Sequence, residues 1–299
     1  MKWFVAAMLA LLGCDSVYGL TGRDDKDAAV TDAASDGTSS DGPMSCDPGR
    51  DPTGDDDSDG ISNQNDGCPT IEDRGYNEDG DCSGDVCDPC PQIAAPVADQ
   101  EGDGVGDACD LPGGSVDGAR MDGFGDVDEI EPPGLPGWTH DSVGGTLTNA
   151  SSPTGIYAWA NYEITSPFVI ETQLRVPAGQ FGWNAGIVFG TTVRDQEPDG
   201  WMLAIFRGSS TEATLRLFRL ANGIITAQNM DQPLVLGQVQ RLKIFVAGTL
   251  VSIFSSDGGT QSMASMTLSS PLPANTSFGI AVIGDKSVTF EYLYEVHHQ

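Results

Sequence analysis

The chain has 299 residues, of which 44 are acidic and 14 are basic, and its formal net charge is −30. This balance argues against a nucleic-acid partner, because phosphate would be repelled over almost the whole surface. The charge is uneven, with 32 acids and 5 bases in residues 15–131 but 12 acids and 8 bases in residues 132–299. The acidic part also has few large apolar groups, so it needs bound cations, disulfides or both in order to fold.

The N-terminus has the pattern of an export signal. Lys2 precedes the apolar run "WFVAAMLALLG", which is too short to span a bilayer comfortably. The residues "LLGC" that end at Cys14 resemble the lipobox of bacterial lipoproteins, whose cysteine receives a diacylglycerol. This resemblance implies a signal peptide over 1–13, a lipid on Cys14 and a place at the cell envelope, on the outer membrane or cell surface. An ordinary secretory signal with an incidental cysteine is the alternative, and either one leads to an oxidising compartment.

Behind Cys14, residues 14–45 are small, polar and acidic, which predicts a disordered tether. The other six cysteines all follow within the acidic part of the chain: Cys46, Cys68, Cys82, Cys87, Cys90 and Cys109. Six cysteines permit three disulfides in a region that has no apolar core of its own.

The stretch "DDDSDGISNQND" has the spacing of a calcium loop. The side chains at positions 1, 3, 5, 9 and 12 are Asp55, Asp57, Asp59, Asn63 and Asp66. Position 7, which would contribute its backbone carbonyl, is Ile61. Gly60 at position 6 permits the sharp turn that such a loop requires. An EF-hand is excluded, because the twelfth residue is Asp rather than Glu and the flanks "GRDPTG" and "GCP" cannot be helices. The competing interpretation is an acidic linker.

The same spacing recurs twice. In "NEDGDCSGDVCD" (77–88) the expected ligands are Asn77, Asp79, Asp81, Asp85 and Asp88. In "DQEGDGVGDACD" (99–110) they are Asp99, Glu101, Asp103, Asp107 and Asp110, with the carbonyl of Val105. An acidic linker has no reason to keep these offsets, so the repetition favours calcium. Cys82 occupies position 6 of its copy, where a side chain strains the positive φ that the turn prefers.

The alternation of an acidic loop ending in "CP" with one ending in "GDxCD" resembles the thrombospondin type 3 repeat. The resemblance implies a module over 46–118 that wraps around calcium ions, with Cys68 paired to Cys87 and Cys90 paired to Cys109. Cys46 and Cys82 are then left for each other. A dockerin-like module also uses such loops, but it needs helices where Pro and Cys follow here. The expected result is a stiff, calcium-dependent stalk.

Short apolar runs separated by turn signals fill residues 119–299, and none has a long helical period. They include "FVIETQLRV" (168–176), "GWMLAIFRG" (200–208) and "SVTFEYLYEV" (287–296). In the first run Ile170, Thr172, Leu174 and Val176 alternate with Val169, Glu171, Gln173 and Arg175, which predicts a half-buried strand. The fold class expected is all-β, an antiparallel sandwich or jelly roll. Strand rhythm and stretches such as "LGQVQRLKIFVAGTLVSIF" (236–254) resemble the concanavalin A-type jelly roll of the laminin-G and glucanase superfamily.

The function expected of this head is non-enzymatic binding of glycan or protein. Glycoside hydrolysis needs two carboxyls held across the sugar. The nearest group, Asp195, Glu197 and Asp199, lies in "RDQEPDG", which reads as a turn. Glu163 and Glu171 are the other acids to test if the head is instead a glycoside-processing enzyme. The aromatic residues that offer sugar platforms are Tyr157, Trp159, Trp183 and Trp201, although core packing is the more ordinary role for each.

Overall fold

The computed structural model describes residues 50–71, 77, 79–94, 97–111, 117–124, 130–131, 137–142, 145–149, 152–175, 182–195, 198–209, 213–234, 239–256, 261–284 and 286–298. The signal peptide, Cys14, the tether, Cys46, Val176 and Glu197 lie outside these ranges. Within them the chain forms no helix able to cross a membrane. Residues 50–111 are irregular loops and turns where they are described, and strands follow.

Every regular element of the described chain is a β-strand. The strands are β1 (Asp117–Asp122), β2 (Ile130–Glu131), β3 (Trp138–Asp141), β4 (Thr146–Asn149), β5 (Ser152–Ala160), β6 (Phe168–Arg175), β7 (Trp183–Thr191), β8 (Gly200–Arg207), β9 (Ala213–Ala221), β10 (Ile224–Pro233), β11 (Val239–Ala247), β12 (Leu250–Ser256), β13 (Gln261–Thr267), β14 (Ser277–Gly284) and β15 (Thr289–His298). The all-β prediction is confirmed.

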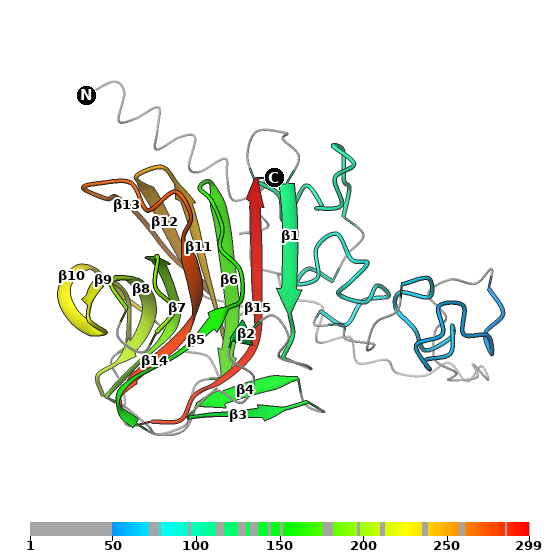
Figure 1. Cartoon of the computed structure of the whole chain (residues 1–299), viewed down its shortest axis with the longest axis horizontal. Coiled ribbons are helices and arrows are strands. Elements are labelled where there is room, and N and C mark those ends of the chain that lie inside the picture. The colour runs from blue at the N-terminus through cyan, green and yellow to red at the C-terminus, as the bar shows by residue number, and fades with distance from the viewer. Residues whose placement is uncertain are drawn as a thin grey trace, which may run out of the picture.

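The strands form two antiparallel sheets (Figure 1). The eight-stranded sheet has the order β13-β12-β11-β6-β15-β4-β3, and the seven-stranded sheet has the order β10-β9-β8-β7-β14-β5-β2. The eighth strand, β1, pairs with the C-terminal half of β15, from Asp122 opposite Leu293 to Asp117 opposite His298. Some neighbours are consecutive strands, such as β8 and β9, whereas others, such as β6 and β15, are far apart in the chain and are brought together when the sandwich forms.

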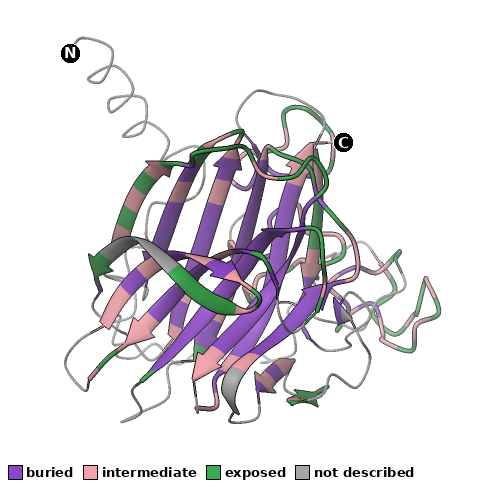
Figure 2. Ribbon diagram, turned by 60° about the vertical axis from the view of Figure 1, so that its left-hand side comes forward, coloured by how far each residue is buried: buried purple, intermediate pink, exposed green. Residues whose placement is uncertain are grey.

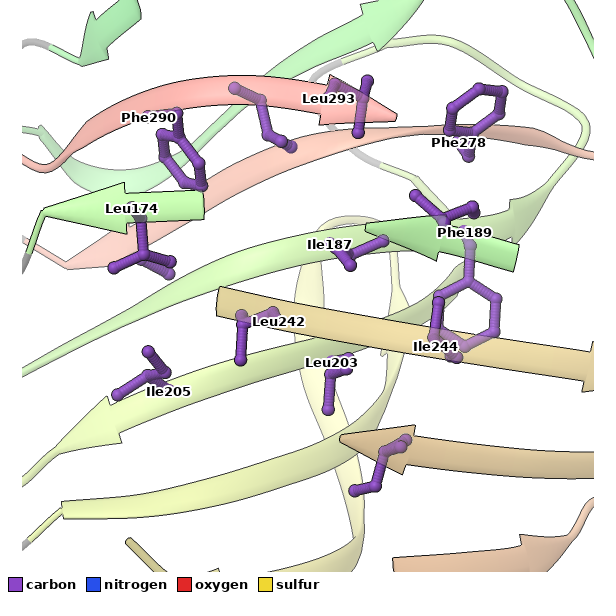
Figure 3. Packing of buried hydrophobic residues seen from close by; sticks show 14 of the residues in the cluster. Leu174, Ile187, Phe189, Leu203, Ile205, Leu242, Ile244, Phe278, Phe290 and Leu293 are labelled. Carbon is purple, nitrogen blue, oxygen red and sulfur yellow. The ribbon is translucent and has the colours of Figure 1, made fainter. Parts of the chain in front are cut away.

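The main core lies between the sheets and is built from the alternate residues that each strand turns inward. Its members include Leu174 on β6, Ile187 on β7, Leu203 on β8, Ile244 on β11 and Phe290 on β15, all fully buried (Figure 3). The central strands are buried along most of their length (Figure 2). Strand β7 is buried at all nine positions, so both of its faces are covered.

The prediction that β6 is half-buried is wrong. Every residue from Phe168 to Thr172 is buried, including Val169 and Glu171 on the face expected to meet solvent. This face is covered by the loop segment that ends at Leu111, which packs against β6 and β15. The segment lies beside these strands in Figure 1, whereas residues 50–71, drawn in blue, extend away from the sheets. The described part of the acidic region that ends at Leu111 is therefore in contact with the eight-stranded sheet.

Candidate functional site

The first acidic loop brings carboxylate oxygens together. One oxygen each from Asp55, Asp57 and Asp59 lies within 4.8 Å of the others. The carboxylate of Asp55 accepts the backbone N–H of Ser58 at 2.7 Å and that of Gly60 at 3.1 Å, which curls the chain around it. Gly60 has a φ of 94°, the left-handed conformation that the sequence predicts for position 6. The loop is therefore shaped by its own backbone donors.

Asp66 closes the same loop from its far end. The residue is 3 % exposed, and its Oδ1 accepts the backbone N–H of Cys68 at 2.8 Å. Its Oδ2 is buried without a hydrogen-bond partner, as is Oδ2 of Asp57. Burial, together with the charges of Asp57, Asp59 and Asp55, raises the pKa of the Asp66 carboxyl. Buried carboxylate oxygens of this kind are costly unless a cation pairs with them, and they are the hard ligands that Ca²⁺ prefers.

The third loop repeats the hydrogen bonds of the first. Asp99 accepts the N–H groups of Gly102 at 2.6 Å and Gly104 at 3.0 Å, as Asp55 does with the equivalent residues. Asp107 at position 9 accepts the backbone N–H of Gln100 at 2.9 Å, matching the bond from the Asp56 N–H to the Asn63 Oδ1 at 3.1 Å. Equal offsets in the sequence thus produce equal backbone geometry.

The second loop gathers a different set of oxygens. Asp79, Asp81 and Asp88 each place one oxygen within 4.8 Å of the others, and in the described chain only this group and the Asp55 group meet so closely. Burial, with the charges of Asp81 and Asp79, raises the pKa of Asp88 to about 6. Asp85 lies in the turn that precedes Cys87. Asn77 accepts the N–H of Gly80 at 2.7 Å through Oδ1, so it shapes the loop in the manner of Asp55.

The strain expected at Cys82 is not found. The left-handed residue of the second loop is Gly80, with φ 73°, and the described non-glycine residues with positive φ are Ser58, Phe124 and Asn222. Cys82 is exposed and is the free cysteine among those described. Its expected partner, Cys46, lies outside the described residues.

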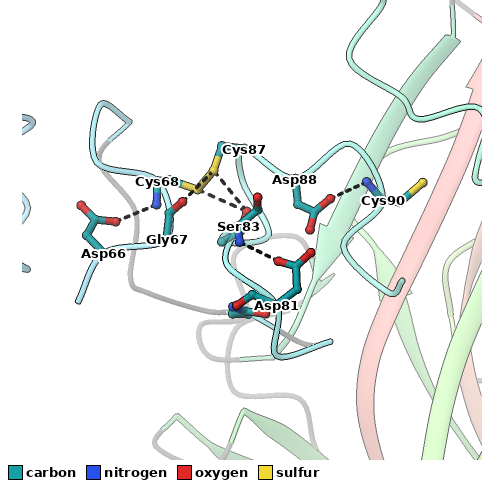
Figure 4. Close-up of a disulfide and its surroundings, with 10 residues drawn as sticks. Asp66, Gly67, Cys68, Asp81, Ser83, Cys87, Asp88 and Cys90 are labelled. Carbon is teal, nitrogen blue, oxygen red and sulfur yellow. Dashed lines mark hydrogen bonds between the residues drawn. A yellow bond between two sulfur atoms is a disulfide. The ribbon is translucent and has the colours of Figure 1, made fainter. Parts of the chain in front are cut away.

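Two disulfides join the three loops. Cys68 is bonded to Cys87 (Figure 4) and Cys90 to Cys109, the pairs that the thrombospondin resemblance implies. The first bond holds loop 55–66 against loop 77–88, and the second holds loop 77–88 against loop 99–110. Gly67 lies so near the second loop that a Cβ placed on it would be 2.4 Å from the backbone nitrogen of Gly84.

The second disulfide is also the centre of the contact with the sandwich. A buried apolar cluster joins Cys90, Val105, Cys109 and Leu111 of the loops to Val169, Tyr292, Tyr294 and Val296 of the eight-stranded sheet. Val105 is the residue whose carbonyl is expected to bind calcium in the third loop. Its side chain is buried against the head, so the loop and the sheet share one residue.

Under this contact lies a buried charge cluster centred on Glu171, which is 1 % exposed. Its carboxylate is 3.2 Å from the guanidinium of Arg241 and 3.4 Å from the ammonium of Lys243, and it accepts the Tyr292 hydroxyl at 2.6 Å. Arg241 also donates to the carbonyl of Gln92 in the loop segment at 3.3 Å. Burial alone would raise the pKa of Glu171, but Arg241 and Lys243 outweigh it and lower the pKa. Glu171 therefore acts as a structural anion, with no access to a substrate.

Three of the four aromatic residues considered as sugar platforms are buried: Trp183 in the main core, and Tyr157 and Trp159 on the other face of the seven-stranded sheet. The rings of Tyr157 and Trp159 are stacked with centroids 5.8 Å apart. Trp159 Nε1 donates to the carbonyl of Asp195 at 2.9 Å, and the Tyr157 hydroxyl donates to that of Gly223 at 3.1 Å. The chain's own turns therefore cover these rings, and the ordinary packing role holds for all three.

Trp201 is half-buried and lines a groove of about 500 Å³ at one end of the sandwich. The other residues that line this groove include Asp199, Arg219, Ser269, Ser270 and Leu272. Trp201 and Asp199 are among the candidate residues proposed from the sequence, whereas Arg219 and residues 269–273 are not. The pairing of β8 with β9 brings Arg219 directly opposite Trp201, and no local pattern reveals such a pairing.

The acids considered for catalysis have different environments. Asp199 accepts the backbone N–H of Asn222 at 2.7 Å, which fastens the turn before β8 as the sequence predicts. Asp195 and Glu163 are exposed. Glu197 lies outside the described residues.

No family model and no curated protein matches the chain. Among solved structures, it is similar to the lectin UEA-II complexed with galactose (TM-score 0.42, 12% identity, 60% of this chain and 98% of that one). It is also similar to a Bacillus licheniformis beta-glucanase (TM-score 0.40, 11% identity, 61% of this chain and 99% of that one). A third similar structure is a xylan beta-1,4-xylosidase from Bacillus halodurans C-125 (TM-score 0.43, 16% identity, 58% of this chain and 38% of that one). The chain thus spans 38% of the xylosidase. Similarity at these values does not bear on activity.

Proposed function

We propose that this chain is an exported, lipid-anchored calcium-binding surface protein whose β-sandwich head binds glycan. In this proposal the three acidic loops form a thrombospondin type 3-like module. Calcium stabilises this module and the two disulfides staple it. The lipid on Cys14 and the tether of residues 14–45 would hold it at the cell envelope.

The observation that carries the calcium proposal is the buried oxygen of Asp66. A loop shaped only by its own hydrogen bonds would leave its acids exposed to water. Here Oδ2 of Asp66 and Oδ2 of Asp57 are buried, unpartnered and part of a group of four acids whose charges raise the pKa of Asp66. Ca²⁺ would neutralise these charges and supply the missing partner, and its binding energy would become folding energy.

Titration calorimetry of the full chain with Ca²⁺ tests this. We expect saturable binding, with dissociation constants of about 10⁻⁴–10⁻³ M as in extracellular modules. Asp66→Asn should weaken one class of sites by about tenfold or more, because hydrogen bonds and contacts to a charged group contribute about 1.5–3 kcal/mol. The matched control is Asp56→Asn, which removes the same charge from position 2, where the side chain pairs with Arg50 at 2.6 Å. Equal losses in the two variants would show diffuse acidity instead of a coordinated ion.

The head is proposed as a binding module and not as an enzyme. Glu171 is enclosed beneath the loops, and Asp199 fastens a turn. Incubation with a panel of polysaccharides should release no reducing ends, whereas the same polysaccharides should retain the protein in pull-down. Release that is abolished by Asp195→Asn or Asp199→Asn would support the glycoside-processing alternative.

The anchor has its own test. Replacing Cys14 by Ser should move the protein from the detergent-extracted membrane fraction to the medium or the soluble fraction, because the acyl chains supply the membrane affinity. Unchanged membrane association would show that Cys14 does not carry the anchor.

A further inference from the structure

We propose that the groove around Trp201 and Arg219 is the glycan site of the head, and that it takes a neutral pyranose unit. This inference rests on the proposed glycan-binding function and adds the place and the class of sugar. The groove holds about 500 Å³, within the range of roughly 300–1,000 Å³ found for small-molecule sites.

The aromatic part of the groove is held open by the fold. Trp201 is the second residue of β8, and its side chain packs against the main core, as does Leu272 from the connection between β13 and β14. A Cβ on Gly190 would lie 2.9 Å from Leu272 Cδ2 and 3.2 Å from Trp201 Cδ1. Glycine at position 190 therefore leaves the space in which Trp201 and Leu272 meet. Because Tyr157, Trp159 and Trp183 are buried, Trp201 is the one of the four considered aromatic residues that is partly exposed and lines the groove, where its ring can contact the C–H groups of a sugar.

The polar part of the groove contains one basic and one acidic side chain, Arg219 and Asp199. The Arg219 guanidinium carbon lies 5.6 Å from the centroid of the Trp201 ring, on the strand position directly opposite. Asp199 immediately precedes the strand, is exposed, and uses one oxygen to accept the Asn222 N–H. The groove thus contains the five N–H donors of the Arg219 guanidinium and the carboxylate acceptor of Asp199. The hydroxyls of Ser269 and Ser270 can donate or accept hydrogen bonds.

This chemistry selects a neutral polyol. A sugar hydroxyl both donates and accepts, so neighbouring hydroxyls can bond to Asp199 and to Arg219 together. An anionic sugar would meet Asp199 and a protein of net charge −30, whereas a cationic ligand would meet Arg219. The apolar C–H face of a pyranose fits Trp201, which supports a sugar over a more polar solute.

Binding of defined trisaccharides to the full chain tests the proposal. The neutral probes are maltotriose, cellotriose, xylotriose and mannotriose, and the acidic probe is trigalacturonate. Calorimetry and saturation-transfer NMR measure their binding. We expect saturable binding of at least one neutral trisaccharide and an affinity loss of about tenfold or more in Trp201→Ala and Arg219→Met. Asp199→Asn keeps an oxygen that accepts the Asn222 N–H but removes the negative charge. It should therefore reduce the ratio of the affinity for neutral sugars to the affinity for trigalacturonate.

The matched control is Arg216→Met on the same strand. The Arg216 guanidinium carbon lies 3.5 Å from the centroid of the Phe206 ring and outside the groove, so its loss should leave affinity within about twofold. Trp201→Phe serves if Trp201→Ala fails to fold, as judged by circular dichroism.

The outcomes separate the site from the function. Wild-type affinity for glycan in both Trp201→Ala and Arg219→Met would overturn the groove as the binding site and leave a glycan-binding head; Arg219→Met with Trp201→Phe decides this if Trp201→Ala does not fold. Binding of trigalacturonate alone would overturn the neutral class. Binding of no sugar at all would overturn both the groove and the glycan-binding head, while the calcium proposal would stand or fall on Asp66→Asn.

Discussion

At the scale of single residues, Glu171 shows how a charge becomes structural. Alternation along β6 places it on the face expected to meet solvent, yet it is buried between Arg241 and Lys243 under the loop module. Its pKa is lowered in the folded protein. The stabilisation it contributes is therefore present at neutral pH and is lost as the pH falls through the folded-state pKa.

Replacing Glu171 by Gln should lower the free energy of unfolding by about 3 kcal/mol or more, because Lys243 would be left buried without its anion. Urea unfolding of the calcium-loaded full chain measures this. Glu163→Gln is the control, since Glu163 is exposed and its change should cost less than about 0.5 kcal/mol. Adding Lys243→Met to Glu171→Gln should recover part of the loss. Equal free energies of unfolding in Glu171→Gln and Glu163→Gln would contradict the role given to Glu171.

At the scale of elements, the acidic loops are stabilised by contact with one another. The described segment has few buried apolar residues away from the head, so its rigidity depends on the disulfides, on the proposed ions and on close backbone approach. Beside the first disulfide, Gly67 (labelled in Figure 4) lies against the backbone of Gly84. A side chain at Gly67 cannot be accommodated by rotation of a neighbour, because the atom it meets is backbone.

Replacing Gly67 by Ala should separate the first two loops at a cost of about 1–3 kcal/mol, the usual range for overpacking. Limited proteolysis of the calcium-loaded protein, followed by mass spectrometry, should show faster cleavage within residues 50–90 while the head stays intact. Val86→Ala is the control in the same segment, since Val86 is 60 % exposed. Cleavage at the wild-type rate in Gly67→Ala would mean that the two loops approach less closely in solution.

At the scale of the whole molecule, the loops and the head form one structure. Val105 belongs to the third loop and to the apolar cluster that covers Val169, Tyr292 and Tyr294. Binding of the proposed calcium ion in this loop would thereby be connected to the outer face of the eight-stranded sheet. Loss of the ions should loosen the loops from that face and leave the sandwich folded, because the main core lies on the other side of β6 and β15.

Chelation of Ca²⁺ should increase binding of the dye ANS and accelerate hydrogen exchange of residues 97–111 by about tenfold or more, while β7 and β14 stay protected. Asp103→Asn should reproduce this, since it removes the charge of an expected calcium ligand while keeping an oxygen to accept the Val105 N–H, which lies 2.9 Å from the Asp103 Oδ1. Asp59 has the same position in the first loop, where its Oδ1 accepts the Ile61 N–H at 2.7 Å. Asp59→Asn should therefore leave the head unaffected. Unchanged exchange of 97–111 after chelation would refute the connection.

The sequence by itself determined the features that depend on neighbours along the chain. Ligand offsets and glycines predict the loops, cysteine spacing is matched by the two disulfides, and apolar alternation predicts strands such as β6, β8 and β15 with ends correct to a few residues. These features arise from local hydrogen bonding and side-chain period, which any stretch of chain carries with it.

Only the tertiary structure decided which faces are covered. Glu171 is buried because a segment 60 residues or more away packs over it, Tyr157 and Trp159 are covered by turns from elsewhere in the sheet, and Arg219 meets Trp201 through strand pairing. Alternation shows that a strand has two faces, but it does not show what lies against the second one. Burial, pKa and the shape of a groove depend on that second contact, because they arise from atoms that are close in space and distant in the chain.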